Sequence, residues 1–194
     1  LSGAPRQLGP VVASSIAKKN GLAVSLLERL IASPLYARGA PSVLTKLVRN
    51  YRNHPDILSL PNRLFYGNDL VPCADRGVSH SLAHWQHLPN KGVPLIFDGF
   101  EGDNQRESNS PSWFNAGEAS RVVDYVLKLV RDTKAAAPHD IGVISPYVKQ
   151  VQKIRELLRH EGAKAPGLGL QAIKVASTEL FQGQERRVII ISTV

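Results

Sequence analysis

Short apolar runs rich in β-branched residues alternate along this chain with segments of helical periodicity. Runs of this kind are typical of strands buried on both faces of a parallel sheet. They predict strands at residues 43–49, 94–98, 141–145, 173–177 and 187–194. Stripes of apolar residues at helical spacing predict helices around residues 22–30, 122–130 and 151–158.

Local residue choices refine the ends of these elements. Residues 55–65 are predicted to form a further helix, with Pro55 in its first turn and Pro61 as a break or a kink. Asn115 followed by Glu118 is typical of a capping box that opens the next helix. Segments rich in Gly, Pro and polar residues predict loops at residues 67–92, 99–112 and 161–170.

The order of strands and helices predicts the fold class. Alternating strands and helices imply βαβ units, and therefore an α/β fold with a mainly parallel sheet and helices on both faces. The length of 194 residues fits one domain over residues 1–194. Ligands of open parallel sheets bind at the carboxyl ends of the strands. The segments that follow the predicted strands include residues 50–55, 146–147 and 177–179.

Charge and composition narrow the classes of partner. Lys and Arg number 24 against 16 Asp and Glu, which gives a net charge of +8 and favours a polyanionic partner. This charge does not choose between RNA, DNA, a nucleotide and an acidic protein. The single cysteine, Cys73, excludes an internal disulfide and zinc-finger spacing. The apolar runs are too short to predict a membrane span, and the first residues do not resemble a signal peptide.

Two further features concern the class of protein. The chain lacks Met and stops inside an apolar run, so we expect it to be a fragment of a longer protein. A nicotinamide dinucleotide enzyme is disfavoured, because Gly-x-Gly-x-x-Gly does not follow a predicted strand.

Four strings in a fixed order resemble the conserved motifs of superfamily 1 helicases. Residues 3–10 resemble motif III, residues 51–55 resemble motif IV, and residues 177–192 resemble motif V. Residues 141–147 together with Gln150 resemble the segment between motifs IV and V. Residues 73–75 and 110–115 are most similar to the Armitage-like branch, which comprises RNA helicases of small-RNA silencing related to the nonsense-decay helicases.

This resemblance implies the second RecA-like domain of such a helicase, with a RecA-like fold of the P-loop-NTPase type. The Walker motifs would lie in a first RecA-like domain, and motif VI would follow residue 194. The isolated chain is therefore expected to be inactive as an ATPase, while the full-length protein would be an ATP-dependent RNA helicase with ATP and Mg²⁺ as cofactors.

The resemblance also assigns residues to the ATP cleft. Arg52 would be an arginine finger on the γ-phosphate, a role that contributes roughly 10³–10⁵ in rate in phosphoryl transfer. Gln7 would bridge the ATP phosphates and the nucleic acid, since its amide both donates and accepts hydrogen bonds. Tyr51, Gly183 and Glu185 would contact ATP, with Glu185 accepting a hydrogen bond from a ribose hydroxyl. No metal ligand is predicted in the chain.

The RNA side is assigned to the ends of two strands. Pro146 starts a helix whose N-terminus offers free N–H groups, Tyr147 offers a ring for base stacking, and Gln150 lies on the first turn. Lys149 would make a salt-dependent contact to the RNA backbone, and Ser177 and Thr178 would donate to a phosphate or a sugar. For His54 and for the pair Asn115 and Glu118, helix capping is the favoured interpretation, and Trp113 and Phe114 are expected to be core or staple residues.

Two departures from the family pattern leave alternatives open. Ala4 stands where motif III usually has Asp, and Glu179 stands where motif V usually has Asp. The alternatives are a DNA helicase of the same superfamily and a non-catalytic RecA-like scaffold for RNA or protein, which Ala4 favours.

For the full-length protein the resemblance implies 5′-to-3′ translocation. The expected partners are single-stranded RNA, the first RecA-like domain and proteins of the piRNA or siRNA silencing pathways. The expected location is the cytoplasm, including ribonucleoprotein granules.

Overall fold

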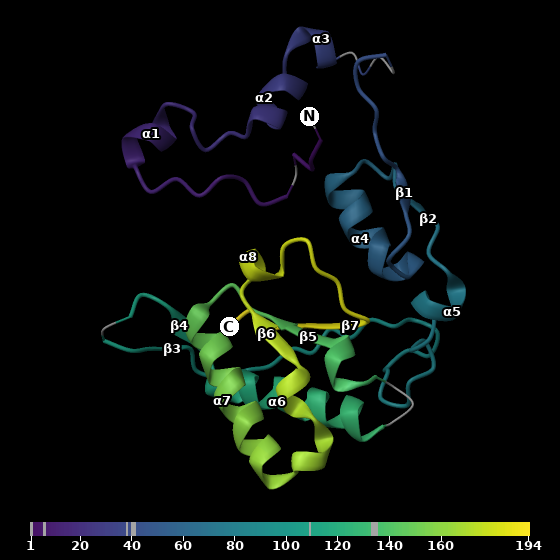
Figure 1. Cartoon of the computed structure of the whole chain (residues 1–194), viewed down its shortest axis with the longest axis vertical. Helices are drawn as coiled ribbons and strands as arrows, with labels where there is room; N and C mark the ends of the chain where they lie inside the picture. Colours follow the sequence, from purple (N-terminus) through teal and green to yellow (C-terminus); the bar gives the residue numbers. More distant parts are fainter. Residues whose placement is uncertain (1, 6, 38, 40–41, 109, 133–135) are drawn as a thin grey trace. The chain divides into compact units, whose positions relative to one another are not determined.

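The computed structural model describes residues 2–5, 7–37, 39, 42–108, 110–132 and 136–194 and divides the chain into two compact units (Figure 1). The first unit comprises Leu1–Asp75 and the second Arg76–Val194. The contacts gather within these two units, and the expectation of one domain over residues 1–194 stays a prediction. Arg6, inside the string that resembles motif III, lies outside the described residues.

The first unit contains short elements joined by irregular segments. Its described elements, in chain order, are α1 (Ser15–Lys19), α2 (Leu26–Ile31), α3 (Pro34–Ala37), β1 (Arg49–Asn50), α4 (Pro55–Phe65) and β2 (Val71–Pro72). The helix expected around residues 22–30 is confirmed from Leu26 onward. It begins there because the Ser25 side chain caps it, accepting a hydrogen bond from the Glu28 N–H at 3.1 Å.

The strand expected at residues 43–49 is wrong for most of its length. The structure has strand geometry at Arg49–Asn50, paired in parallel with Val71–Pro72, and irregular chain at residues 43–48. A strand needs a partner along its length, and here the described pairing covers two residues on each side. Leu47 is 86% exposed, so the apolar pattern of residues 43–49 does not correspond to a buried side chain at this position.

Helix α4 confirms the predicted helix at residues 55–65. Pro55 occupies its first turn, where the absent N–H costs nothing. Pro61 lies inside the helix, which continues to Phe65, so Pro61 does not end it.

The second unit is built on a three-stranded parallel sheet. Strands β5 (Ile141–Ile144), β6 (Lys174–Ala176) and β7 (Val188–Ile191) lie in the order β6-β5-β7. Ile144 pairs with Ala176 on one side and with Ile191 on the other. These strands confirm the runs predicted at residues 141–145, 173–177 and 187–194, within slightly shorter bounds.

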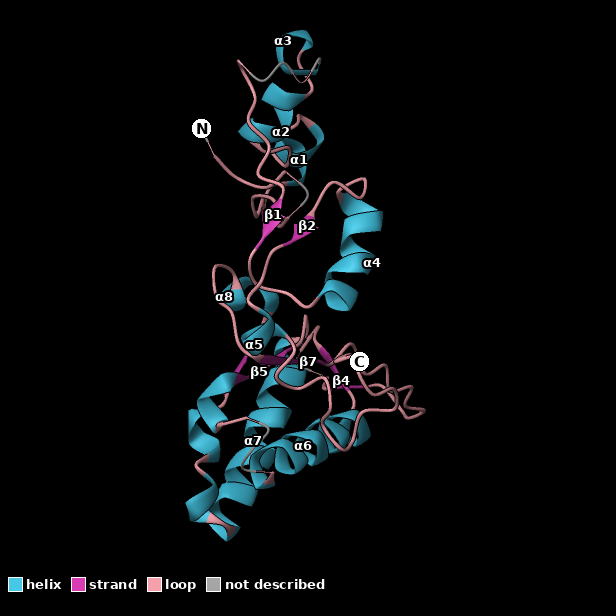
Figure 2. Ribbon diagram, turned by 90° about the vertical axis from the view of Figure 1, so that its right-hand side faces the viewer, coloured by secondary structure: helices cyan, strands magenta, loops and turns pink. Residues whose placement is uncertain are grey.

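Two long helices cover one face of this sheet. Helices α6 (Ala116–Arg131) and α7 (Val148–Lys164) confirm two predicted helices and lie on the same side of the strands (Figure 2). The core between them and the sheet includes Val126, Val130, Ile141, Val143, Ile154 and Val175.

The other face carries α8 (Thr178–Phe181), whose Phe181 lies so close to Gly142 that an added Cβ there would be 2.7 Å from its ring. Ile189 and Ile191 are 39% and 65% exposed. The helices expected on both faces are therefore unequal: long on one face and short on the other.

The rest of the second unit connects these elements. It holds α5 (Arg76–Ser79), an antiparallel hairpin of β3 (Gln105–Arg106) and β4 (Trp113–Phe114), and 3-10 turns at Pro138–Asp140, Pro166–Leu168 and Leu170–Ala172. The predicted loops at residues 67–92 and 99–112 thus contain short elements, and α7 extends into the loop predicted at 161–170.

The strand expected at residues 94–98 is wrong, because this segment is irregular chain that is held by side chains. Arg121 on α6 donates from Nε to Asp98 Oδ2 at 2.7 Å. This hydrogen bond from Arg121, aided by one that involves Tyr125, holds the pKa of the Asp98 carboxyl below its usual range. The apolar run at 94–98 is therefore fixed to a helix and not to a neighbouring strand.

The helices in the described part of the chain are too short or too polar to cross a bilayer.

Candidate nucleic-acid interface

Three segments meet where the parallel strands of the second unit end. Residues 145–147 follow β5, residues 177–179 follow β6, and residues 192–193 follow β7; we call these segments the carboxyl edge. The Ser145 N–H donates to the Ala176 carbonyl at 3.2 Å, and the Ser192 N–H donates to the Ile144 carbonyl at 2.9 Å. The backbone thus holds the three segments side by side, as the sequence predicted for strands that share a direction.

The middle segment leads into the first turn of α7. Pro146 is exposed, and Tyr147 is half-buried at the N-cap position. The Tyr147 N–H donates to Ser145 Oγ at 3.3 Å, which orders the turn between strand and helix. The positive end of a 17-residue helix therefore lies at the carboxyl edge, where it favours an anion.

Lys149 lies on this first turn with its charge already paired. Its Nζ lies 2.6 Å from Glu107 Oε2, and its side chain is 25% exposed. Its backbone N–H donates to Ser112 Oγ at 3.1 Å. An RNA phosphate at Lys149 would have to compete with Glu107, and the contact to RNA stays a prediction.

Gln150 is fully buried, which does not fit the direct RNA contact that the sequence analysis assigned to it. Its Oε1 accepts from the Asn115 N–H at 2.9 Å. Its Nε2 donates to the Asn115 carbonyl at 3.2 Å and to Ser192 Oγ at 2.9 Å. Gln150 therefore positions the segments before α6 and after β7 instead of facing a ligand.

Asn115, which is buried, and Glu118, which is half-buried, complete this arrangement. Asn115 Oδ1 accepts from the Glu118 N–H at 2.9 Å, which confirms the predicted cap of α6. The Glu118 carboxylate accepts from Ser192 Oγ and from the Thr193 N–H, both at 2.8 Å. The second bond of a capping box is thus replaced by Gln150. We call Asn115, Glu118, Gln150 and Ser192 the buried polar network.

Sequence reasoning missed this network because a local explanation was sufficient for each residue. Asn115 and Glu118 have capping-box spacing. Gln150 lies on the first turn after Pro146 and Tyr147, which the sequence analysis assigned to the RNA side. The contacts join positions up to 74 residues apart, and such pairs leave no local pattern in one sequence.

The segment after β6 is organised around a carboxylate. Hydrogen bonds from the Ser177 hydroxyl and from the Glu179 backbone, with a smaller one from Thr178, hold the pKa of the Glu179 carboxyl below its usual range. Both hydroxyls that were predicted to donate to RNA therefore face Glu179, which is exposed and carries a negative charge at neutral pH. Ser177 and Thr178 lie at the carboxyl edge, and their contact to RNA stays a prediction.

The connection from α8 to β7 runs back toward the amino ends of the strands. Gly183 has φ of 75°, a left-handed conformation that glycine adopts at little cost. Gln184 Oε1 accepts from Lys174 Nζ at 2.7 Å, and the Glu185 carbonyl accepts from Arg186 Nη1 at 2.7 Å. Gly183 and Glu185 are thus in a connection distinct from the carboxyl edge, and their role toward ATP stays a prediction.

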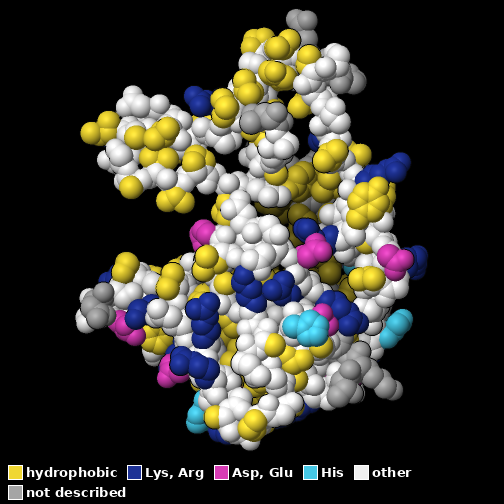
Figure 3. Space-filling view, viewed as in Figure 1, with side chains coloured by type: hydrophobic (Ala, Val, Ile, Leu, Met, Phe, Trp, Pro, Cys, Tyr) yellow, Lys and Arg dark blue, Asp and Glu magenta, His cyan; other side chains and the backbone are white. Residues whose placement is uncertain are grey.

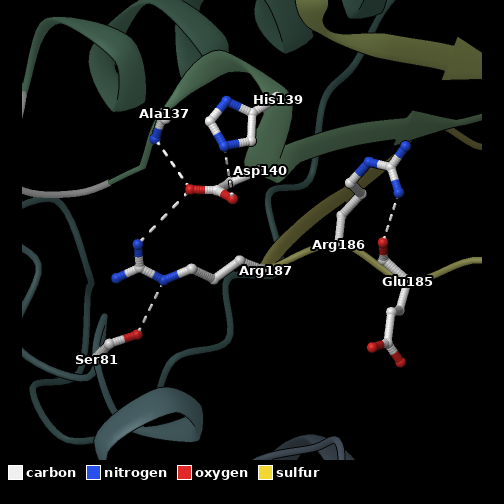
Figure 4. A network of polar contacts seen from close by, with 7 residues as sticks. All are labelled: Ser81, Ala137, His139, Asp140, Glu185, Arg186 and Arg187. Atoms are coloured by element: carbon white, nitrogen blue, oxygen red, sulfur yellow. Dashed lines mark hydrogen bonds and ion pairs between the residues drawn. The ribbon is translucent and has the colours of Figure 1, made fainter.

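The start of β7 is anchored by Arg187 (Figure 4). Its Nε donates to Ser81 Oγ at 3.2 Å, and its Nη1 lies 3.8 Å from Asp140 Oδ2. The same carboxylate oxygen accepts from the Ala137 N–H at 3.3 Å. These contacts join the amino ends of β5 and β7 to the segment after α5, which fixes the sheet from the side opposite the carboxyl edge.

The residues predicted for catalysis belong to the first unit. Asn50 Oδ1 accepts from the N–H groups of Arg52 at 3.1 Å and Asn53 at 2.9 Å, which holds the turn after β1. Arg52 is exposed, and Tyr51 is 67% exposed. His54 is buried and its Nδ1 accepts from the Asp56 N–H at 3.2 Å, so its predicted capping role is confirmed.

Gln7 lies elsewhere in the first unit, in a turn closed by its N–H to the Ala4 carbonyl at 3.1 Å. It lines a hollow of about 320 Å³ together with residues of α2. The catalytic roles of Gln7 and Arg52 and the ATP contact of Tyr51 stay predictions. Among the residues that the structure describes, no three His, Cys, Asp or Glu side chains gather as a metal site would require.

Comparison with known proteins gives a family match and a set of relatives. The family model AAA_12, described as an AAA domain, matches residues 22–194. The chain is 51% identical over 205 aligned residues to the RNA helicase Mov10l1 of Homo sapiens, with 100% of the chain and 16% of that protein covered. It is 38% identical to the protein named "Probable RNA helicase armi" of Drosophila melanogaster, where the alignment covers 100% of the chain and 17% of armi. It is 34% identical to the ATP-dependent helicase NAM7 of Saccharomyces cerevisiae, where 100% of the chain and 19% of NAM7 are covered.

Proposed function

Because this chain belongs to the AAA_12 family of AAA domains, we propose that it is the second RecA-like domain of an ATP-dependent RNA helicase. The relatives confirm the resemblance to the Armitage-like branch, and the family confirms the α/β fold class of the RecA-like type. The chain spans less than a fifth of each of the three relatives named above. Helicase activity is therefore proposed for the longer protein to which this domain would belong.

The observation that carries the proposal is the convergence of motif-like segments at one edge of a parallel sheet. The strings that resemble motif V and the segment preceding it are far apart in sequence, and their strand ends lie side by side as residues 145–147 and 177–179. The helix N-terminus at Tyr147 gives this edge an anion-binding character, and the hydroxyls of Ser177 and Thr178 would have to exchange Glu179 for an RNA phosphate. Single-stranded RNA, with an anionic backbone and unstacked bases, fits such an edge.

The ATP side of the proposal is assigned to the first unit. The turn held by Asn50 exposes Arg52, so that its guanidinium is able to reach a γ-phosphate bound by another domain. The Walker A pattern Gly-x-x-x-x-Gly-Lys-Ser/Thr does not occur in this sequence, so the other RecA-like domain would hold most of ATP and Mg²⁺. Gln7, Tyr51, Gly183 and Glu185 would complete the cleft from this side.

A working cycle follows from these assignments. Closure of the two RecA-like domains on ATP would bring Arg52 to the transferred phosphoryl group, where its positive charge stabilises the transition state. The closed state would hold RNA at the carboxyl edge, and hydrolysis would release it. By resemblance, the direction of movement would be 5′ to 3′.

The biological setting is inferred from the same resemblance. The name of Mov10l1 states an RNA helicase, and that of armi does the same. We infer a role in piRNA- or siRNA-mediated silencing, with pathway proteins as partners and a cytoplasmic location that includes ribonucleoprotein granules.

The test compares two arginines in the full-length protein. Arg52→Ala should reduce the RNA-stimulated ATPase rate constant by about 10³-fold or more, while the affinity for single-stranded RNA changes little. Arg63→Ala is the matched control, because Arg63 is also exposed in the first unit and lies on α4. Equal ATPase rates in the two variants would remove the arginine-finger role.

ATPase and binding assays on the full-length protein also distinguish the alternative functions. Ala4 in place of the usual Asp favours a non-catalytic scaffold, which would bind RNA without any ATPase activity in the parent protein. A DNA helicase would prefer single-stranded DNA over RNA of the same length when both are titrated at two salt concentrations.

A further inference from the structure

We propose that the β3–β4 hairpin is a second contact for single-stranded RNA, where a nucleobase stacks on Trp113 beside Arg106. This inference rests on the RNA-binding function proposed above and extends it to residues outside the helicase-like motifs. The relevant observations are the exposure of an aromatic side chain, its pairing with a cation, and the attachment of the hairpin to the carboxyl edge.

Trp113 is an exposed aromatic residue in a position where burial was expected. Sequence analysis expected a core or staple residue here, yet Trp113 is 40% exposed, whereas Trp85 is 9% exposed. Arg106 and Trp113 are direct cross-strand partners of the hairpin, and the Arg106 guanidinium carbon lies 5.2 Å from the centroid of the indole. The hairpin therefore presents a large flat ring and an exposed guanidinium together.

Two contacts attach this hairpin to the first turn of α7. Ser112, one residue before Trp113, accepts the Lys149 N–H at its Oγ at 3.1 Å. Glu107, one residue after Arg106, pairs with Lys149 Nζ at 2.6 Å. The segment that connects β3 and β4 is therefore attached to Lys149, two residues from Tyr147, and the hairpin lies next to α7 (Figure 1).

The chemistry of this surface matches a single strand of RNA. An indole stacks on any base, and a neighbouring guanidinium is able to contact the adjacent phosphate or to stack as well. Because Lys149 joins the hairpin to the first turn of α7, one RNA strand would pass both Tyr147 and Trp113, and the two rings would hold separate bases. Lys and Arg side chains spread over the face of the second unit shown in Figure 3, which favours a polyanion there.

Tryptophan fluorescence provides a direct test, because the chain has two tryptophans and they differ in exposure. Single-stranded oligouridylate should quench the fluorescence of the 194-residue chain through stacking on Trp113. Trp113→Phe leaves Trp85 as the remaining tryptophan, so the quench should disappear. Because phenylalanine also stacks, the affinity measured by anisotropy of labelled RNA should stay within about twofold of the parent.

Affinity measurements on further variants separate stacking from charge. Trp113→Ala should weaken binding by about fivefold or more, the lower end of what base stacking contributes. Arg106→Ala should also weaken binding and should reduce the slope of log K against log salt by about 0.7, as expected for one lost contact to a single-stranded phosphate. Arg159→Ala is the matched control, because Arg159 is exposed farther along α7 and should leave both quantities unchanged.

The outcomes distinguish this inference from the function on which it rests. If the chain binds RNA, shows no quench, and Trp113→Ala binds like the parent, the hairpin contact is overturned and the carboxyl edge keeps its proposed role. If the parent chain binds no single-stranded RNA at low salt, both proposals fail. Equal losses in Trp113→Ala and Trp113→Phe would assign Trp113 a structural role and overturn the stacking contact.

Discussion

Replacement of Gln150 tests whether the buried polar network holds the carboxyl edge together. Gln150→Ala removes the acceptor of the Asn115 N–H and the donor to Ser192 Oγ. The Asn115 carbonyl keeps a second donor, the Ala119 N–H at 3.0 Å, and Ser192 keeps Glu118 as its acceptor. The main loss is therefore one orphaned backbone N–H together with the space that the side chain filled.

The expected cost follows from these two losses. Asn115 is 4% exposed, and a buried donor without a partner costs about 1–3 kcal/mol. Truncation of a fully buried side chain of this size adds a cavity cost of about 2 kcal/mol or more. We expect a loss of about 3–5 kcal/mol in the free energy of unfolding, which lowers Tm by at least about 6 °C in a chain of this size.

Thermal unfolding of the 194-residue chain, followed by circular dichroism, measures this loss. Gln150→Leu keeps most of the volume and should show only the cost of the orphaned N–H, about 1–3 kcal/mol. Gln152→Ala is the matched control, because Gln152 is exposed on the same helix and should change stability by less than about 0.5 kcal/mol. If Gln150→Ala is as stable as Gln152→Ala, the reasoning about the network is refuted.

Two further predictions concern the second unit. Arg121 holds the pKa of Asp98 below its usual range. Ionised Asp98 therefore stabilises the fold at pH values above the ordinary carboxyl pKa of about 3.9. This contribution is lost as pH falls through the lower pKa that Asp98 has in the folded state. Asp98→Asn should therefore be less stable than the parent at pH 7, with a difference that shrinks below about pH 4 in denaturant titrations; a difference that is independent of pH would contradict the ion-pair explanation. Gly183 has φ of 75° and open space where a Cβ would lie, so Gly183→Ala should cost about 1 kcal/mol in the free energy of unfolding, from backbone strain alone. Gly183→Asn should cost less in the same denaturant titrations, since Asn tolerates this conformation better, and equal stability of parent and Ala variant would show that the left-handed turn is not required.

The sequence predicted the parts of the fold that local pattern determines. The runs that became β5, β6 and β7 are short, apolar and β-branched, and each lies in the sheet. The segment at 94–98 is also short and mainly apolar, and it is irregular because strand formation depends on a partner that composition does not specify. Asp98 and Arg121, which hold that segment, are 23 residues apart.

The sequence predicted the part of the candidate site that follows from the order of the elements, and it missed the part that depends on contacts between distant residues. Parallel strands bring their ends to one edge, so the neighbourhood of Tyr147 and Ser177 followed from the order of the elements. The burial of Gln150 did not follow, since it depends on Asn115 and Ser192, which lie 35 and 42 residues away. The exposure of Trp113 was missed because an aromatic residue before a helix cap is usually a packing residue.

Binding of single-stranded RNA at the carboxyl edge of the second unit is the property on which the proposed function depends most. Photo-crosslinking of the 194-residue chain to RNA that contains 4-thiouridine, followed by mass spectrometry of the peptides, tests it most directly. We expect crosslinks in the peptides that contain Tyr147 and Ser177–Thr178, reduced by competition with unlabelled RNA more than with DNA. Crosslinks confined to peptides outside residues 145–149 and 177–179 and the β3–β4 hairpin would contradict RNA binding at this edge.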